Sequence, residues 1–166
     1  MKKVLITLLI LPCMAMAQTT TLDFPNAESA TKLVQNYVAA LQSGDITAMN
    51  AQLADNAMIY NLGKATDSLN VAQHGAYFTT SAENYEHSIA QDLYLPVKVT
   101  DSWNAGEWVL SWGVNTITSK STGEVITVPY HTASLVENGK IVALHYFYDL
   151  LNVREKQGFK ILPPSK

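Results

Sequence analysis

Histidines and tyrosines are the residues of this sequence with the clearest capacity for chemistry. Two of the four histidines, His131 and His145, lie with three tyrosines in the β-rich stretch 124–149. A neutral imidazole in an apolar site can act as general acid, general base or hydrogen-bond donor, and a tyrosine hydroxyl can donate to a substrate oxygen. This stretch therefore holds the first candidates for acid–base chemistry or for ligand binding.

The spacing of these side chains does not favour a metal or a nucleotide cofactor. The histidines are His74, His87, His131 and His145, and no two form a His-x-His or His-x-x-x-His pair. A zinc site needs three or four converging ligands. The sequence also has no Gly-x-Ser-x-Gly elbow and no glycine-rich phosphate loop. We therefore expect no metal and no cofactor.

The first seventeen residues have the composition of a secretory signal peptide. Lys2 and Lys3 precede a short apolar run, and 15–17 (Ala-Met-Ala) fits a small-x-small cleavage site. The apolar run is too short to span a bilayer as a helix. We therefore predict export, to a periplasm or out of the cell, with a mature chain from Gln18. The alternative is a lipoprotein with its lipid on Cys13.

The composition of the predicted mature chain limits the classes of partner. Removal of Lys2 and Lys3 from the 11 basic residues leaves nine against 14 acidic ones, a net charge of −5. This charge argues against binding of nucleic acid or of an anionic membrane surface. Cys13 is the only cysteine and falls in the signal peptide, so we expect no disulfide. The remaining length suits one domain.

Hydrophobic periodicity predicts two helices at the start of this domain. Apolar residues recur at helical spacing between Ala30 and Leu41, with Asn26 as N-cap and Gly44 as the stop. Asp45 can cap a second, short helix. The buried side of that helix is expected to be Ile46, Met49 and Leu53.

After these helices the pattern changes from helical to alternating. The predicted elements are a short strand (57–60), a polar linker (66–70), a third helix (71–80) and extended runs (89–100, 107–118, 124–149). The last run is a hairpin, because Asn138 and Gly139 lie between its two β-rich halves. Helices followed by a meander of antiparallel strands predict an α+β domain, with helices packed on one face of a curved sheet.

Alternation assigns residues to the two faces of each strand. On the 107–118 strand the even positions are larger and more apolar than the odd ones, so we expect them to face the helices. Trp112 lies on this even face. It is expected to be part of the core, a stacking platform for a ligand, or both. On the last strand, alternation places two sets of residues on opposite faces. One set is Leu144, Tyr146 and Tyr148, and the other is His145, Phe147 and Asp149.

Short runs of this sequence resemble a known superfamily. The runs 37–45 (Tyr-Val-Ala-Ala-Leu-Gln-Ser-Gly-Asp) and 53–57 (Leu-Ala-Asp-Asn-Ala) resemble the nuclear transport factor 2-like superfamily, and the first is also similar to ketosteroid isomerase. The run 139–142 (Gly-Lys-Ile-Val), before an aromatic strand, looks like the SnoaL-like polyketide cyclase branch. This fold hosts isomerases, cyclases, dehydratases and binding modules, so the resemblance predicts the fold better than the activity.

The resemblance implies a cystatin-like cone, with N-terminal helices packed on a strongly curved, mostly antiparallel sheet and a pocket at the open end. The expected divisions are a signal peptide (1–17), a lead-in (18–27), the SnoaL-like domain (28–155) and a C-terminal tail (156–166). The resemblance also implies a homodimer through the outer sheet face.

Carried over residue by residue, the resemblance implies an incomplete catalytic set. Tyr37 matches the isomerase tyrosine that donates to the substrate oxyanion, and His131 falls at the second oxyanion donor. Asn61 takes the place of the proton-shuttling carboxylate, and an amide is not a base at neutral pH. Tyr146 takes the place of the acidic residue on the last strand of the cyclases.

The resemblance directs His131 into the cone, together with its same-face neighbours on that strand, Pro129, Ala133 and Leu135. The alternative for His131 is a core histidine bonded to a tyrosine hydroxyl or to a carbonyl. Tyr37 is either a ligand contact or a core aromatic. The other expected ligand-binding residues are Asn61, Trp112, Leu144, Tyr146 and Tyr148.

Three functions follow from this reading. The first is an exported domain that binds a small, largely hydrophobic, oxygen-bearing molecule in an apolar cone. The second is an enzyme of the isomerase, cyclase or dehydratase type, with His131 as acid or base and Tyr37 as oxyanion donor. The third is a dimeric protein-interaction module that uses its outer sheet face, where Phe147, Val109 and Ile117 are expected.

Overall fold

The computed structural model describes residues 19–62, 67–160 and 162. Within them the helices are α1 (Ala27–Ser43), α2 (Ile46–Asn50), α3 (Val71–Asn84) and α4 (Leu150–Lys156). The strands are β1 (Thr19–Thr21), β2 (Leu53–Tyr60), β3 (Ser68–Leu69), β4 (Tyr85–Thr100), β5 (Gly106–Ser119), β6 (Val125–Glu137) and β7 (Lys140–Tyr148). The predicted signal peptide, 1–17, lies outside the described residues.

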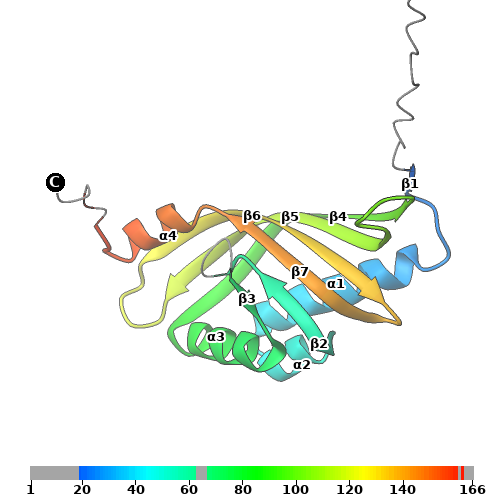
Figure 1. Ribbon diagram of the computed structural model, residues 1–166. Helices are drawn as coiled ribbons and strands as arrows, with labels where there is room; N and C mark the ends of the chain where they lie inside the picture. The colour runs from blue at the N-terminus through cyan, green and yellow to red at the C-terminus, as the bar shows by residue number, and fades with distance from the viewer. Residues whose placement is uncertain (1–18, 63–66, 161, 163–166) are drawn as a thin grey trace, which may run out of the picture.

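A curved, unclosed sheet arches over α1, α2 and α3, while α4 lies at one end of it (Figure 1). The strand order is β1-β4-β5-β6-β7-β2-β3. All neighbouring strands are antiparallel except β2 and β7, which run parallel. The predicted α+β class and the mostly antiparallel curved sheet are therefore confirmed. None of the helices in the described part of the chain has the length and apolar composition needed to cross a membrane.

The first helix pair follows the predicted signals, with one shift. Gly44 ends α1 in the left-handed conformation (φ 71°), and the Asp45 side chain caps α2 by accepting from the amide of Ala48 at 2.8 Å. Asn26 occupies the N-cap position but makes no capping bond with its side chain. Leu53 is buried as predicted, but from the first position of β2, because α2 ends at Asn50.

The third helix is longer than predicted and contains a glycine for a steric reason. It begins with a capping box between Asn70 and Gln73 and continues to Asn84. A Cβ atom on Gly75 would lie 2.5 Å from the amide nitrogen of Asn50. The close approach of α2 to α3 therefore requires glycine at this position, despite its low helix propensity.

The two faces of β5 are the reverse of the prediction. The odd positions Val109, Ser111 and Gly113 are buried, whereas Trp112 on the even face is 37% exposed. The larger and more apolar face is thus the outer one. The reason is space: α1 and a cavity occupy the inner side, so several inner positions carry small side chains. Alternation separates the two faces of a strand but does not show which one has a helix against it.

The same register turns His131 outward. His131 pairs with Trp112 on β5 and with Phe147 on β7, and directly opposed residues share one face of a sheet. The predicted inward orientation of His131, Pro129, Ala133 and Leu135 is therefore wrong. The buried residues of β6 are Ile126, Val128, Thr132, Ser134 and Val136.

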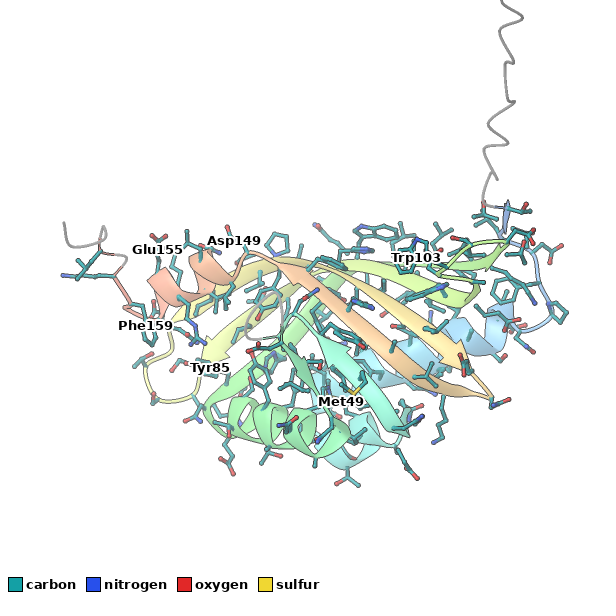
Figure 2. All side chains as sticks on the ribbon, in the orientation of Figure 1. Met49, Tyr85, Trp103, Asp149, Glu155 and Phe159 are labelled. Carbon is teal, nitrogen blue, oxygen red and sulfur yellow. The ribbon has the colours of Figure 1, made fainter. Side chains whose placement is uncertain are left out.

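The core lies between α1, α2 and the inner face of the sheet. Its fully buried side chains include Met49, Ile59 and Ile141, each 0% exposed, and Figure 2 shows Met49 between the helices and the sheet. The packing holds α1 against the sheet. It leaves a space unfilled between α3 and the sheet, at the start of β4 and β6 and the end of β5 and β7. That space is the cavity.

Candidate functional site

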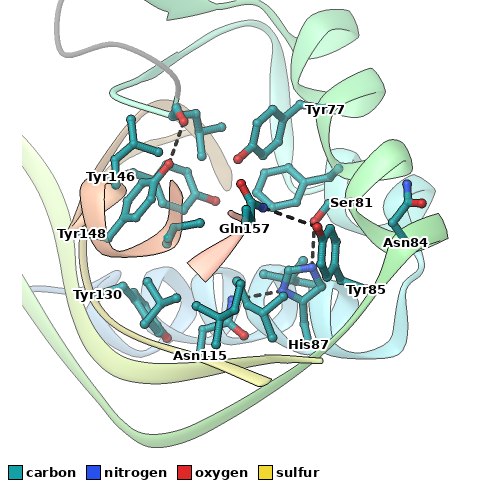
Figure 3. Close-up of a pocket in the computed structure, with 18 of the residues that line it drawn as sticks. Tyr77, Ser81, Asn84, Tyr85, His87, Asn115, Tyr130, Tyr146, Tyr148 and Gln157 are labelled. Carbon is teal, nitrogen blue, oxygen red and sulfur yellow. Dashed lines mark hydrogen bonds between the residues drawn. The ribbon is translucent and has the colours of Figure 1, made fainter. Parts of the chain in front are cut away.

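A cavity of about 670 Å³ lies between α3, the inner face of β4 to β7, and α4. Its lining combines aliphatic side chains with aromatic ones, among them Tyr37, Tyr130, Tyr146 and Tyr148 (Figure 3). Among the described residues that line it, none is a carboxylate; apart from tyrosines, its titratable groups are His87 and Arg154. The site is thus a largely neutral, tyrosine-rich pocket.

A chain of hydrogen bonds runs from the core to the cavity wall. The His74 ring bonds to the Asn50 side-chain oxygen through Nδ1 and to the Tyr37 hydroxyl through Nε2, each at 2.7 Å. The Tyr37 hydroxyl in turn bonds to that of Tyr146. His74 is 0% exposed and lies behind Tyr37, whereas Tyr37 and Tyr146 line the cavity. A buried polar network of this kind fixes the position of the Tyr146 hydroxyl.

The protonation of this chain follows from its partners. Burial lowers the pKa of His74 from 6.5 to about 4, so the ring is neutral near pH 7. Because the Asn50 oxygen only accepts, Nδ1 carries the proton and Nε2 accepts from Tyr37. Tyr146 then donates to Tyr37. Burial also raises the pKa values of Tyr37 and Tyr146, so both hydroxyls keep their protons.

The chain can also run in the opposite direction. A half-turn of the Asn50 amide would offer an N–H to Nδ1 and move the His74 proton to Nε2. His74 would then donate to Tyr37, Tyr37 to Tyr146, and Tyr146 to a ligand. The same side chains can thus accept from a ligand hydroxyl or donate to a ligand carbonyl.

A second polar group lies on the opposite side of the cavity. His87 bonds to the Ser81 hydroxyl through Nε2 at 2.9 Å and to the Asn115 side chain through Nδ1 at 3.0 Å (Figure 3). Burial lowers the pKa of His87. Among the described residues, the Asn115 oxygen Oδ1 is buried without a hydrogen-bond partner.

Tyr130 supplies another buried polar atom without a partner in the described part of the chain. Its ring lies against Gly113 on β5, where a Cβ atom would stand 2.8 Å from the hydroxyl oxygen. Gly113 is therefore required for Tyr130 to lie flat against the sheet and leave the cavity open. Burial raises the pKa of Tyr130 to about 12, with a smaller contribution from the negative charge of Asp92.

Three of the seven predicted site residues meet at this cavity: Tyr37, Tyr146 and Tyr148. Tyr146 and Tyr148 point inward from β7 as predicted. The Tyr148 hydroxyl donates to the carbonyl of Leu62 at 2.7 Å, so it ties the end of β2 to β7. Tyr37 lies on α1 and is 3% exposed, which makes it both a core aromatic and part of the cavity wall.

The other four are not among the residues that line the cavity. Leu144 points inward but is fully packed in the core, and Asn61 follows β2 in a left-handed conformation (φ 67°). Trp112 and His131 stack on the outer face, with ring centroids 4.7 Å apart. His131 also donates from Nδ1 to the carbonyl of Ser111 at 2.9 Å. His131 therefore lies on the outer face of the sheet, away from the cavity.

Two other histidines, His74 and His87, take the inner positions. His74 lies three residues after Val71 and four before Phe78, a helical spacing that places it on the buried side of α3. His87 lies two residues before Ile89, and both line the cavity from the same face of β4. Periodicity could have identified both histidines. Their hydrogen-bond partners come from other elements and leave no sequence signal.

The described residues contain no group of three histidine, cysteine, aspartate or glutamate side chains arranged to hold a metal ion.

The sequence model of the SnoaL-like domain family matches residues 34–144, about two thirds of the chain. The chain belongs to the SnoaL-like domain family. The matched region contains the whole of β2 to β6 and most of α1, so it includes most of the cavity lining. The predicted resemblance to this branch of the nuclear transport factor 2-like superfamily is confirmed. A comparison with curated proteins finds no significant match.

Solved structures with related folds have diverged far in sequence. A Bacillus subtilis protein described as a candidate isomerase shares 15% identity at a TM-score of 0.68, covering 84% of this chain and 100% of its own. A candidate polyketide cyclase of Xanthomonas campestris shares 21% identity at a TM-score of 0.65, and the match covers 79% of this chain and 98% of the cyclase. An LEH-like epoxide hydrolase of M. tuberculosis shares 14% identity at a TM-score of 0.62, and the match covers 80% of this chain and 91% of the hydrolase. At these identities the likeness shows the fold alone.

Proposed function

We propose that this SnoaL-like domain binds a small, largely hydrophobic molecule that carries oxygen atoms. The observation that supports this most directly is the cavity of about 670 Å³, on whose wall the Tyr146 hydroxyl ends the hydrogen-bond chain from His74. A hydroxyl that is fixed in this way is a ready hydrogen-bonding group for an oxygen on a bound molecule.

The size and lining of the cavity agree with such a ligand. A volume of about 670 Å³ falls within the range of about 300–1,000 Å³ that is usual for small-molecule sites. Aliphatic and aromatic walls favour a flat or cyclic apolar body. The hydroxyl of Tyr146 can then hydrogen-bond to an oxygen on that body.

Native mass spectrometry of the protein purified from its own host tests this function. A retained small molecule would support the cavity as a ligand site and report the ligand's mass. The same spectrum gives the N-terminus and so tests the proposed export, since cleavage after Ala17 would leave Gln18 first. A protein that retains nothing, and that no member of a library of hydrophobic ketones and phenols stabilises against heat, would contradict the proposal.

A Tyr146→Phe substitution is expected to weaken binding of an oxygen-bearing ligand about tenfold, which corresponds to about 1.4 kcal/mol. The variant keeps the ring but removes the hydroxyl at the cavity end of the His74 chain. Titration calorimetry with the retained compound measures the change. Tyr148→Phe is the matched control, because that hydroxyl already donates to Leu62. Equal losses in the two variants would contradict a specific role for Tyr146.

A proton-transfer enzyme is the second candidate function, and the chain from His74 to Tyr146 favours it. If Tyr146 donates to a substrate carbonyl, Tyr37 and His74 can stabilise the negative charge that develops there. An isomerase, cyclase or dehydratase needs such stabilisation next to a carbonyl. Turnover of the retained compound, lost in Tyr146→Phe, would distinguish an enzyme from a binding protein.

We also propose that the protein forms a homodimer through its outer sheet face. Trp112, His131 and Phe147 form an aromatic row across β5, β6 and β7, in which Trp112 is 37% and Phe147 48% exposed. Leu93, directly opposite Trp112 on β4, is 61% exposed and extends the same face. Such a contiguous apolar surface is typical of an interface.

A Phe147→Lys variant is expected to be monomeric under conditions in which the wild-type protein is dimeric. A charge at the centre of the aromatic row would have to be buried without a partner. Sedimentation velocity measures the change. Trp103→Lys is the control, since Trp103 is 97% exposed but lies in the turn between β4 and β5. A wild-type monomer at all concentrations tested would contradict the dimer.

A further inference from the structure

We propose that Ser81, His87 and Asn115 form a serine nucleophile site that hydrolyses small hydrophobic esters in the cavity. The three side chains come from α3, β4 and β5, and all of them line the cavity. The inference rests on the proposed function to the extent that the cavity must admit a small molecule. It adds a reaction and a bond to be broken.

The geometry is that of a nucleophile, a base and a group that orients the base. Ser81 Oγ lies 2.9 Å from His87 Nε2, and the Asn115 amide lies 3.0 Å from His87 Nδ1. A hydroxyl within hydrogen-bond reach of an imidazole, whose other nitrogen is held by a third side chain, is the arrangement that activates serine nucleophiles on unrelated folds. The role is recognised from these contacts, because the sequence around Ser81 carries no nucleophile motif.

The Asn115 amide decides which nitrogen of His87 carries the proton. With Nδ2 toward the ring, Asn115 donates to Nδ1, and its own Oδ1 is left without a partner among the described residues. A half-turn of the amide is nearly isosteric and places Oδ1 on Nδ1–H. Nε2 then accepts the proton of Ser81. In this state Nδ2 occupies the former place of Oδ1.

The surroundings suit a base and an oxyanion donor. Burial lowers the pKa of His87, so the ring is neutral and able to accept a proton near pH 7. Tyr85 begins β4 in an extended conformation, so it shares a face of that strand with His87 two residues later, and both side chains line the cavity (Figure 3). The Tyr85 hydroxyl accepts from Gln157 at 3.4 Å, and a tyrosine hydroxyl can donate to a developing oxyanion.

The reaction needs only an ester and water. Ser81 Oγ attacks the ester carbonyl carbon while its proton moves to His87 Nε2. The bond from the carbonyl carbon to the alkoxy oxygen then breaks, and His87 returns the proton to the leaving alcohol. A water molecule attacks the acyl group on Ser81, gives one proton to His87, and releases the carboxylic acid as Ser81 regains that proton.

The test uses 4-nitrophenyl butyrate as substrate and a fluorophosphonate as covalent probe, with the full mature chain. The expected results are release of 4-nitrophenolate and a phosphonyl adduct on the peptide that contains Ser81. Ser81→Ala and His87→Ala should each lose at least about a hundredfold in kcat/KM. Ser29→Ala should keep the wild-type value, because Ser29 is an exposed serine on α1. The adduct tests the site without any substitution, so it does not depend on the variants folding.

Binding is measured separately with the butyl ether of 4-nitrophenol, which cannot be hydrolysed. Line broadening of the ether in NMR spectra, without ester hydrolysis and without an adduct, would overturn the nucleophile site and leave the binding function standing. Hydrolysis that persists in both Ser81→Ala and His87→Ala would also overturn it. If the ether does not bind and the ester is not hydrolysed, the nucleophile site is refuted, and the native mass spectrum alone decides the binding function.

Discussion

A His74→Ala variant is expected to have a free energy of unfolding about 4 kcal/mol below that of the wild-type protein. His74 is 0% exposed, so the substitution leaves a cavity between α3 and Tyr37, which for large buried side chains costs about 2–5 kcal/mol. It also leaves Tyr37 and Asn50 without the partner that each now holds at 2.7 Å. Urea unfolding followed by circular dichroism measures the loss.

His145→Ala is the matched control for this prediction. His145 stacks on Tyr60 at the outer face, with ring centroids 4.5 Å apart, and is only partly buried. Its removal should cost less than about 1.5 kcal/mol, because solvent can reach the space that it leaves. A loss in His74→Ala no larger than that of the control would show that the polar chain behind the cavity does not stabilise the fold.

The stability of the protein is expected to fall by up to about 3 kcal/mol between pH 6.5 and pH 4 through His74 alone. Burial lowers the pKa of His74 to about 4 in the folded state, whereas the unfolded chain protonates it near 6.5. Over this interval the unfolded state binds more protons than the folded state. Falling pH therefore favours unfolding, and the contribution of His74 is complete only above about pH 6.5.

A His74→Gln variant separates this contribution from other titrating groups. Glutamine does not titrate in this range, while His87 and the carboxylates remain in both proteins. The unfolding free energy of the wild-type protein minus that of the variant should therefore decrease from pH 7 to pH 4. A difference that is independent of pH would contradict a neutral, buried His74.

Local signals in the sequence were sufficient for most of the fold. Gly44 and Asp45 end one helix and start the next, and both act in the structure as their residue types predict. Asn138 and Gly139 form the hairpin turn with φ values of 50° and 72°. These signals depend on a few neighbouring residues, which is why they can be read without the tertiary structure. The α+β class follows from their order along the chain.

The candidate site was only partly predictable. Tyr146 and Tyr148 share the inner face of β7, and alternation on that strand identified the pair. On β5 and β6 the same rule separated the faces correctly, but the choice of the inner face was wrong on both strands. On β5 the choice followed the larger and more apolar side chains, among them Trp112, and on β6 it followed the family resemblance, which directed His131 inward.

The sequence by itself therefore determined the family, the order of elements and the two residue sets of each strand. Only the tertiary structure decided which set lies inside. It also brought Tyr37 against His74, 37 residues away, and Ser81 and His87 against Asn115. The reason is physical: a strand's alternation is a local property, whereas the space left by α1 and α3, and the partner that each buried polar atom finds there, depend on contacts between distant segments.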